Sequence, residues 1–189
     1  MRLMVMSAMS RESSTTYIMA KEIVAICEQH GGVDVEFAHP ASVGLPVNDG
    51  NVAWDAPEVV AWQGRVANID AHIWVSPEYH SGMTGGLKNM FDYLNKEPMK
   101  GDVIGLCALA GGGMAALNTL NGMAVVARSL GAWVAPDYVA LNSNEVKDGL
   151  LEGSRKRVEA MVIDVIEGAQ RLQAGLGPES MASPEPTIG

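Results

Sequence analysis

Short runs of apolar residues alternate along the chain with longer stretches in which apolar residues recur every three or four positions. The short runs predict buried strands, and the longer stretches predict amphipathic helices that face a core. Five strands are expected, at residues 2–6, 33–38, 71–76, 103–109 and 133–140. Five helices are expected, at residues 15–29, 56–69, 87–95, 115–130 and 152–173. This alternation predicts an α/β fold with a parallel sheet that is covered on both faces.

The apolar positions within each predicted helix define the side that should face the sheet. In residues 15–29 these are Met19, Ile23, Ile26 and Cys27, which follow the i, i+4, i+7, i+8 spacing of one helix face. The corresponding faces of the later helices are Val59, Trp62, Val66 and Ile69; Leu87, Met90, Phe91 and Leu94; Leu117, Leu120, Ala124 and Ala127; and Val158, Met161, Val162, Val165, Ala169 and Leu172.

Three features mark the limits of this pattern. Residues 39–55 form a polar stretch that contains Pro and Gly and is expected to be a loop. Pro136 has no N–H to donate, so the fifth strand should lie at an edge of the sheet or carry a bulge. Residues 1–174 are expected to form one domain, and residues 175–189, rich in Pro, Ser, Glu and Gly, a disordered tail.

The composition fits a folded domain and argues against several kinds of partner. The 189 residues are 48% hydrophobic, and the net charge of −9 argues against nucleic acid or an anionic membrane as the main partner. No apolar run approaches the roughly 20 residues of a membrane helix. The two cysteines lie in apolar stretches and the four histidines lack metal-ligand spacing, so no disulfide framework or metal site is expected. A strand directly after Met1 leaves no room for a signal peptide, so we expect a cytoplasmic protein.

In such a fold ligands bind beyond the carboxyl ends of the strands, which directs attention to the loops there. The loop after the first strand, residues 7–16, combines hydroxyl side chains with an arginine at a helix N-terminus. Unpaired N–H groups and the helix dipole favour an anion at that place, so Ser10, Arg11, Ser13 and Thr15 are candidates for holding a phosphomonoester. The alternative is a polar loop that only supplies the N-cap. The triphosphate motif G-x-x-x-x-G-K-[ST] does not occur in the sequence.

The loop after the third strand carries a more specific pattern. It reads Pro-Glu-Tyr-His from Pro77 to His80, continues through small residues, and leads into a helix that starts Leu-Lys-Asn. This segment resembles the signature of the NADPH-dependent FMN reductase family, which has a flavodoxin-like fold, a three-layer α/β/α sandwich with a five-stranded parallel sheet. The resemblance implies that the residues of this loop contact the flavin; they are Pro77, Glu78, Tyr79, His80 and Ser81. Because the family more often has Asn at position 80, His80 could contact the flavin edge, face the substrate or lie in solvent.

The loop after the fourth strand is rich in glycine and allows two interpretations. Gly111, Gly112 and Gly113 resemble the loop that lies along the flavin in the same family. Gly111, Gly113 and Ala116, with Asp137 about 20 residues later, also satisfy the dinucleotide fingerprint G-x-G-x-x-[GA]. That fingerprint normally opens the first βαβ unit of a six-stranded sheet, whereas here only one strand follows, so we favour the flavin loop.

The first loop departs from the family pattern at one position. Relatives often have Gly-Ser at the start of this loop, where this chain has Ser7 and Ala8. Losing one neutral hydrogen bond costs on the order of 1 kcal/mol, which would make FMN more exchangeable without abolishing its binding.

The resemblance covers about residues 2–140 and implies an FMN-dependent NAD(P)H oxidoreductase. NADPH or NADH would pass a hydride to the flavin, and a small acceptor (a flavin, quinone, azo compound or metal oxyanion) would then take the electrons. The cofactor carries this chemistry, so no catalytic side chain is assigned, and Glu78 and His80 are the candidates for proton management. Relatives are commonly dimers or tetramers, which implies a homodimer or homotetramer. The alternatives are a flavodoxin-type electron carrier that docks a protein partner, and a flavin-independent regulator that has kept the fold.

Overall fold

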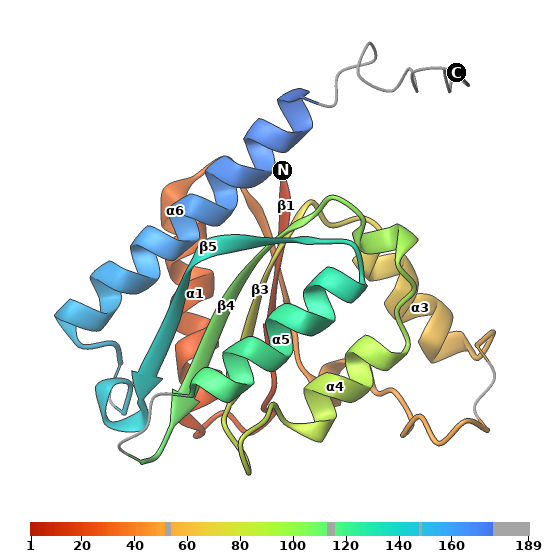
Figure 1. The fold of residues 1–189 in the computed structure, drawn as a ribbon, viewed down its shortest axis with the longest axis horizontal. Helices are drawn as coiled ribbons and strands as arrows, with labels where there is room; N and C mark the ends of the chain where they lie inside the picture. The colour runs from red at the N-terminus through yellow and green to blue at the C-terminus, as the bar shows by residue number, and fades with distance from the viewer. Residues whose placement is uncertain (52–53, 113–115, 148, 176–189) are drawn as a thin grey trace, which may run out of the picture.

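Five parallel strands form the centre of the molecule (Figure 1). The computed structural model describes residues 1–51, 54–112, 116–147 and 149–175. The strands occur in the order β2-β1-β3-β4-β5 across one sheet. Their bounds are β1 Arg2–Ser7, β2 Asp34–Ala38, β3 Ala71–Pro77, β4 Val103–Ala110 and β5 Trp133–Asn142. All five predicted strands are therefore confirmed, with ends that shift by two residues at most.

Helices cover both faces of this sheet, which confirms the three-layer flavodoxin-like fold. Helices α1 and α6 pack on one face, and α3, α4 and α5 pack on the other (Figure 1). The helices are α1 Thr15–His30, α2 Pro40–Val43, α3 Pro57–Val66, α4 Gly85–Asp92, α5 Leu117–Ser129 and α6 Glu152–Gly175, with single 3₁₀ turns at Glu97–Met99 and Ser143–Glu145. Because α6 includes Gly175, the predicted C-terminal tail otherwise lies outside the described residues.

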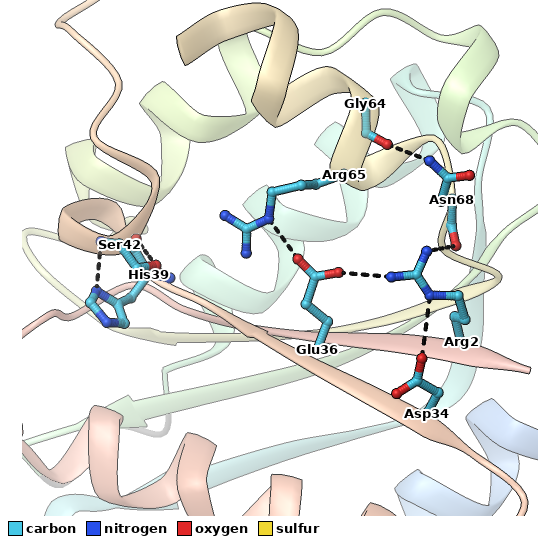
Figure 2. Close-up of polar contacts among 8 residues, drawn as sticks. All are labelled: Arg2, Asp34, Glu36, His39, Ser42, Gly64, Arg65 and Asn68. Atoms are coloured by element: carbon cyan, nitrogen blue, oxygen red, sulfur yellow. Dashed lines mark hydrogen bonds and ion pairs between the residues drawn. The ribbon is translucent and has the colours of Figure 1, made fainter.

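One short helix was not expected from the sequence. Helix α2 lies within the segment predicted as a loop, because His39 and Ser42 form a reciprocal cap around its single turn. The backbone N–H of Ser42 donates to His39 Nδ1 at 3.2 Å, and the N–H of His39 donates to Ser42 Oγ at 3.0 Å (Figure 2). A cap of this kind depends on two side chains that a hydrophobic pattern does not register.

Each central strand supplies side chains to two separate cores. In β1, Leu3 and Val5 face α1 and α6, whereas Met4 and Met6 face the helices of the other layer. This alternation follows from the period of two residues in a strand, and it explains why the strands read as continuous apolar runs. The predicted helix faces pack in the same two cores, where Ala124 and Leu172 are partly buried, with one clear exception. Leu117 is 47% exposed, because α5 begins at this residue, beyond the part of the helix that covers the sheet.

The fifth strand has both features that Pro136 predicted. Strand β5 is the edge of the sheet, next to β4 alone. Val134 pairs with Ile104 and Tyr138 pairs with Leu106, so three residues of β5 lie opposite the single residue Gly105. The ladder is therefore interrupted at the residue that has no N–H to donate.

The opposite edge of the sheet is held by charged side chains. Glu36 of β2 lies between two arginines: Arg65 Nε of α3 is 2.6 Å from one carboxylate oxygen, and Arg2 Nη2 of β1 is 3.3 Å from the other (Figure 2). Arg2 also reaches Asp34 at 3.5 Å and donates to the carbonyl of Asn68 at 3.2 Å. These contacts join β2, β1 and α3 at the amino end of the strands, away from the loops that were expected to bind a ligand.

Candidate functional site

A cavity of about 300 Å³ lies at the carboxyl ends of the strands. The sheet order 2-1-3-4-5 places the reversal of strand order between β1 and β3, where ligands bind in folds of this type. The loops after β1, β3, β4 and β5 all contribute to the cavity wall. The lining residues are Met9, Arg11, Ser13, Ser14, Thr15, Thr16, Pro77, Glu78, Tyr79, Leu109, Gly111 and Ser143.

A larger hollow, of about 490 Å³, lies elsewhere, between α5 and β5. Its lining is mostly apolar and contains none of the residues that the sequence marks as candidates for binding a ligand. We therefore take the smaller cavity as the candidate site, because it gathers hydroxyls, N–H groups and a cation from separate loops.

In the loop after β1 the two interpretations of the sequence turn out to apply to different residues. Ser14 is the N-cap of α1, and its hydroxyl accepts from the N–H of Tyr17 at 3.1 Å. The N–H groups of Thr15 and Thr16 have no acceptor within the described part of the chain. Arg11, Ser13 and Thr15 line the cavity beside them. The capping hydroxyl is thus separate from the groups that remain available for an anion.

Ser10 has a different environment from the other candidates in this loop. Its hydroxyl accepts from the N–H of Ala41 at 2.9 Å, and Ser10 does not line the cavity. The contact attaches α2 to the loop after β1. This explains why α2 matters to the site although it carries no candidate residue.

The departure from the family pattern at Ala8 is accommodated by the fold. Ala8 is 4% exposed and belongs to the core on the α3–α5 side of the sheet. Its carbonyl accepts from Thr84 Oγ1 at 3.4 Å, and Thr84 in turn caps α4 by accepting from the N–H of Leu87. A hydroxyl at position 8 would therefore point into packed side chains and not into the cavity.

The loop after β3 is a tight hairpin in which most backbone N–H groups already donate hydrogen bonds within the protein. The N–H of Glu78 donates to the carbonyl of Leu109 at 2.7 Å, and Tyr79 and Gly82 exchange two backbone hydrogen bonds of 2.9 and 3.1 Å. His80 and Ser81 form the tip, with φ of 50° and 64°. Such left-handed pairs are typical of two-residue turns and favour Asn or Gly, which gives a physical reason for the Asn that the family resemblance leads one to expect at position 80.

The same hairpin determines what its residues can offer a ligand. Pro77, Glu78 and Tyr79 line the cavity, whereas His80 and Ser81 are exposed at the tip and do not. The N–H groups of His80 and Ser81 have no acceptor among the described residues. The hydroxyl of Tyr79 lies 4.0 Å from Met9 Sδ, so the half-exposed ring stands beside the loop after β1.

The glycine-rich loop after β4 is supported by residues that the sequence analysis missed. Asn142 Nδ2 donates to the carbonyl of Gly112 at 3.0 Å, and Ser143 Oγ donates to the carbonyl of Ala110 at 3.3 Å. Gly111 and Ser143 line the cavity, and Gly113 lies outside the described residues. The available signal was positional: Asn142 and Ser143 lie at the carboxyl end of the fifth strand, at the same edge of the sheet.

Glu78 connects this region to a helix. Its Oε2 accepts from the N–H of Thr119, in the first turn of α5, at 3.0 Å. The N-cap residue of α5, Ala116, makes no side-chain capping bond. The carboxylate of Glu78 is thus engaged as a hydrogen-bond acceptor across 41 residues of sequence.

Neither His39 nor the two cysteines adds a charged group to the cavity wall. Burial lowers the pKa of His39, which follows β2 near Glu12, so this side chain is neutral at physiological pH. Burial raises the pKa of the Cys27 thiol to about 12 and raises that of Cys107, so neither supplies a thiolate. Arg11 is the only cationic side chain among the described residues that line the cavity.

Glu145 supports the loop after β5 and is sensitive to acid. It accepts from the N–H of Asn142 and from Ser154 Oγ, both at 2.7 Å. The hydrogen bond from Ser154 is the main cause that lowers the pKa of Glu145. Ionised Glu145 therefore stabilises the folded protein. This contribution is present above the usual glutamate pKa of about 4.3 and is lost as the pH falls through the lower pKa of Glu145 in the folded state.

Replacing Ser154 with alanine should lower the free energy of unfolding by about 1 kcal/mol at neutral pH, because Glu145 loses a hydrogen bond. The difference from the wild type should shrink as the pH falls through the lowered pKa of Glu145, because protonation weakens the same hydrogen bond in the wild type. Urea unfolding at neutral pH and at an acidic pH measures this. Ser129→Ala is the control, because Ser129 donates to the carbonyl of Val126 and its effect should not depend on pH. A Ser154→Ala effect that is equal at both pH values would contradict the assignment.

Comparison with known proteins places the whole sheet in one family. Residues 1–145 match the family model described as NADPH-dependent FMN reductase. Among curated proteins, the chain is 31% identical over 168 residues to an NADPH azoreductase of Bacillus sp. (strain OY1-2), covering 88% of this chain and 89% of the relative. It is 29% identical over 177 residues to the NADPH-dependent FMN reductase ArsH of Acidithiobacillus ferrooxidans, covering 88% of this chain and 70% of the relative.

A solved structure supports the same fold. The flavoenzyme NAD(P)H:(acceptor) oxidoreductase FerB of Paracoccus denitrificans superposes with a TM-score of 0.70 at 20% identity. The superposition covers 90% of this chain and 97% of FerB. At this identity the likeness concerns the fold alone.

Proposed function

The chain belongs to the NADPH-dependent FMN reductase family and is an FMN-dependent NAD(P)H oxidoreductase, and from this premise we propose that the cavity among the loops after β1, β3 and β4 holds the FMN. The observation that carries the proposal is the set of groups gathered there: Arg11, the non-capping hydroxyls of Ser13 and Thr15, helix N–H groups without an acceptor among the described residues, and Gly111. This set suits a ligand with an anionic end and a flat end.

The phosphate is assigned to the loop after β1. Arg11 supplies the charge, Ser13 and Thr15 supply hydroxyls, and the N–H groups of Thr15 and Thr16 supply the helix terminus. Ser10 is assigned a supporting place, since its hydroxyl already holds α2. The net charge of −9 does not attract an anion, so this local set must do so.

The ring is assigned to the loops after β3 and β4. Gly111 has no heavy atom within 4 Å of the position a Cβ would take, which leaves room for a flat ligand to approach the backbone. The N–H groups of His80 and Ser81 are the donors that this hairpin can still offer, and Tyr79 supplies an aromatic surface. FMN held here would supply the redox chemistry between NAD(P)H and an acceptor, while the residues named above would orient its phosphate and its ring.

The acceptor, location and assembly follow as further parts of the proposal. Relatives carry the names azoreductase and FMN reductase, which supports a small acceptor such as an azo compound, a flavin, a quinone or a metal oxyanion. Among the described helices, none is long and apolar enough to cross a bilayer. We assign the protein to the cytoplasm, as a homodimer or homotetramer. The exposed side chains of Trp54 and Trp133 are available for contacts between subunits.

A flavin titration followed by anaerobic reduction tests the function. Purified apoprotein should quench the fluorescence of added FMN, and NADPH or NADH should then bleach the bound flavin without oxygen present. If flavin binds but neither nicotinamide bleaches it, the chain behaves as a flavodoxin-type carrier. If FMN fluorescence is unchanged by the protein, both flavin assignments are wrong.

A further inference from the structure

The carboxylate of Glu78 lies where three segments of the site meet. Its own backbone N–H is bonded to the carbonyl of Leu109 at the end of β4, so the residue is anchored at its backbone. Its side chain reaches Thr119 in the first turn of α5. Glu78 also lines the cavity, next to the loops after β1 and β4.

Three helices that begin at this end of the sheet have the same N–H group capped, but by different means. In α1 the N–H of Tyr17 donates to Ser14, and in α4 the N–H of Leu87 donates to Thr84, so each helix uses its own N-cap hydroxyl. In α5, which begins at Leu117, the N-cap residue is Ala116, and its side chain has no hydroxyl. The equivalent N–H, that of Thr119, is capped by Glu78 from the loop after β3.

The amide of Thr119 depends on this carboxylate. Thr119 has no solvent exposure, so its N–H cannot turn to bulk water when the acceptor is removed. A buried donor without a partner is costly, and a carboxylate at a helix N-terminus also compensates the helix dipole. The start of α5 should therefore move or fray without Glu78, and the glycine-rich loop leads directly into that start.

We propose that Glu78 is a positioning residue, which fixes the start of α5 and thereby Gly111 in the cavity wall, and that it does not carry the protons of the reaction. The assignment rests on the proposed function in one respect, namely that this cavity holds FMN. A proton taken up by the carboxylate would remove its charge and weaken the hydrogen bond from the N–H of Thr119, so proton uptake and capping oppose each other.

Two conservative variants separate positioning from proton transfer, because they change different properties of the side chain. Glu78→Gln keeps the length and an acceptor oxygen but cannot exchange a proton. Glu78→Asp keeps the acid but is shorter by one methylene and does not reach Thr119. If Glu78 is a positioning residue, Glu78→Gln should raise the Kd for FMN by no more than about threefold, and Glu78→Asp should raise it by about tenfold. The reason is that only Glu78→Asp loses the hydrogen bond that caps α5.

The closing experiment first measures hydrogen exchange in the apoprotein and then measures the affinity for FMN. Hydrogen exchange of the Thr119 amide without flavin should be faster in Glu78→Asp and near wild type in Glu78→Gln, and the FMN titrations should give the same order. Glu58→Gln, which alters an exposed acid in the first turn of α3, is the matched control and should change neither. Normal turnover with Glu78→Asp and its loss with Glu78→Gln would overturn the proposal. If no variant and no wild-type protein binds FMN, the proposed function fails, while the exchange data still test the cap.

Discussion

Replacing Arg11 with alanine should weaken FMN binding by about 10- to 100-fold, the loss expected for one charge-assisted hydrogen-bonding group on a phosphate. Arg11 is the only cationic side chain among the described residues around the cavity, and the chain as a whole is anionic. No second cation is therefore placed to replace it. Fluorescence quenching titrations of wild type and variant measure the two dissociation constants.

Riboflavin provides the internal control for this result, because it has the same ring and no phosphate. Arg11→Ala should leave its affinity nearly unchanged. Arg171→Ala removes an equal charge from the exposed part of α6, where Arg171 pairs with Glu167, and should affect neither ligand. Added salt should weaken FMN binding more in the wild type than in Arg11→Ala. An equal loss of riboflavin and FMN affinity in Arg11→Ala would contradict the phosphate assignment.

Among the glycines that the structure describes, Gly105 has the least room for an added methyl group. It is buried in β4, and a Cβ there would lie 2.7 Å from Val165 Cγ2 and 3.2 Å from Met161 Sδ of α6. Valine is branched at Cβ and has little freedom to move aside, so α6 would have to shift from the sheet. Gly105→Ala should therefore lower the free energy of unfolding by about 1–3 kcal/mol, measured by urea unfolding.

A glycine on the facing helix gives the opposite expectation. At Gly168 of α6 a Cβ would meet Val103 at 3.5 Å, an ordinary contact. Gly168→Ala should stabilise the protein by about 0.5–1 kcal/mol, because alanine restricts the unfolded chain and favours the helix. If both substitutions changed stability in the same direction, packing at Gly105 would not be the cause.

The sequence was sufficient for the fold because burial on both faces of a parallel sheet leaves a strong pattern. Runs such as residues 103–109 contain no polar side chain, and the helix faces repeat with the helical period. The sequence also directed attention to the carboxyl ends of the strands, where the candidate cavity lies. The prediction was wrong at Leu117 because it started the helix at residue 115 and assumed that the whole helix covers the sheet, whereas α5 begins at Leu117.

The details of the site depend on contacts between residues far apart in the chain. Nothing in the first loop indicates that Ser10 will bond to α2, and nothing near Glu78 indicates that it will cap α5. The supports of the glycine-rich loop, Asn142 and Ser143, come about 30 residues after it. Such contacts become readable only when the fold has placed the loops side by side.

The interrupted ladder at Pro136 has a consequence for how copies of this chain can meet. An uncovered edge strand exposes a row of N–H and C=O groups on which another chain can extend the sheet. In β5 the row is broken at its middle, by a residue without an N–H and by a displaced backbone. This edge thus resists edge-to-edge aggregation. Subunits of a homo-oligomer would therefore join through side chains at helix and loop surfaces rather than through a continuous intermolecular sheet along β5.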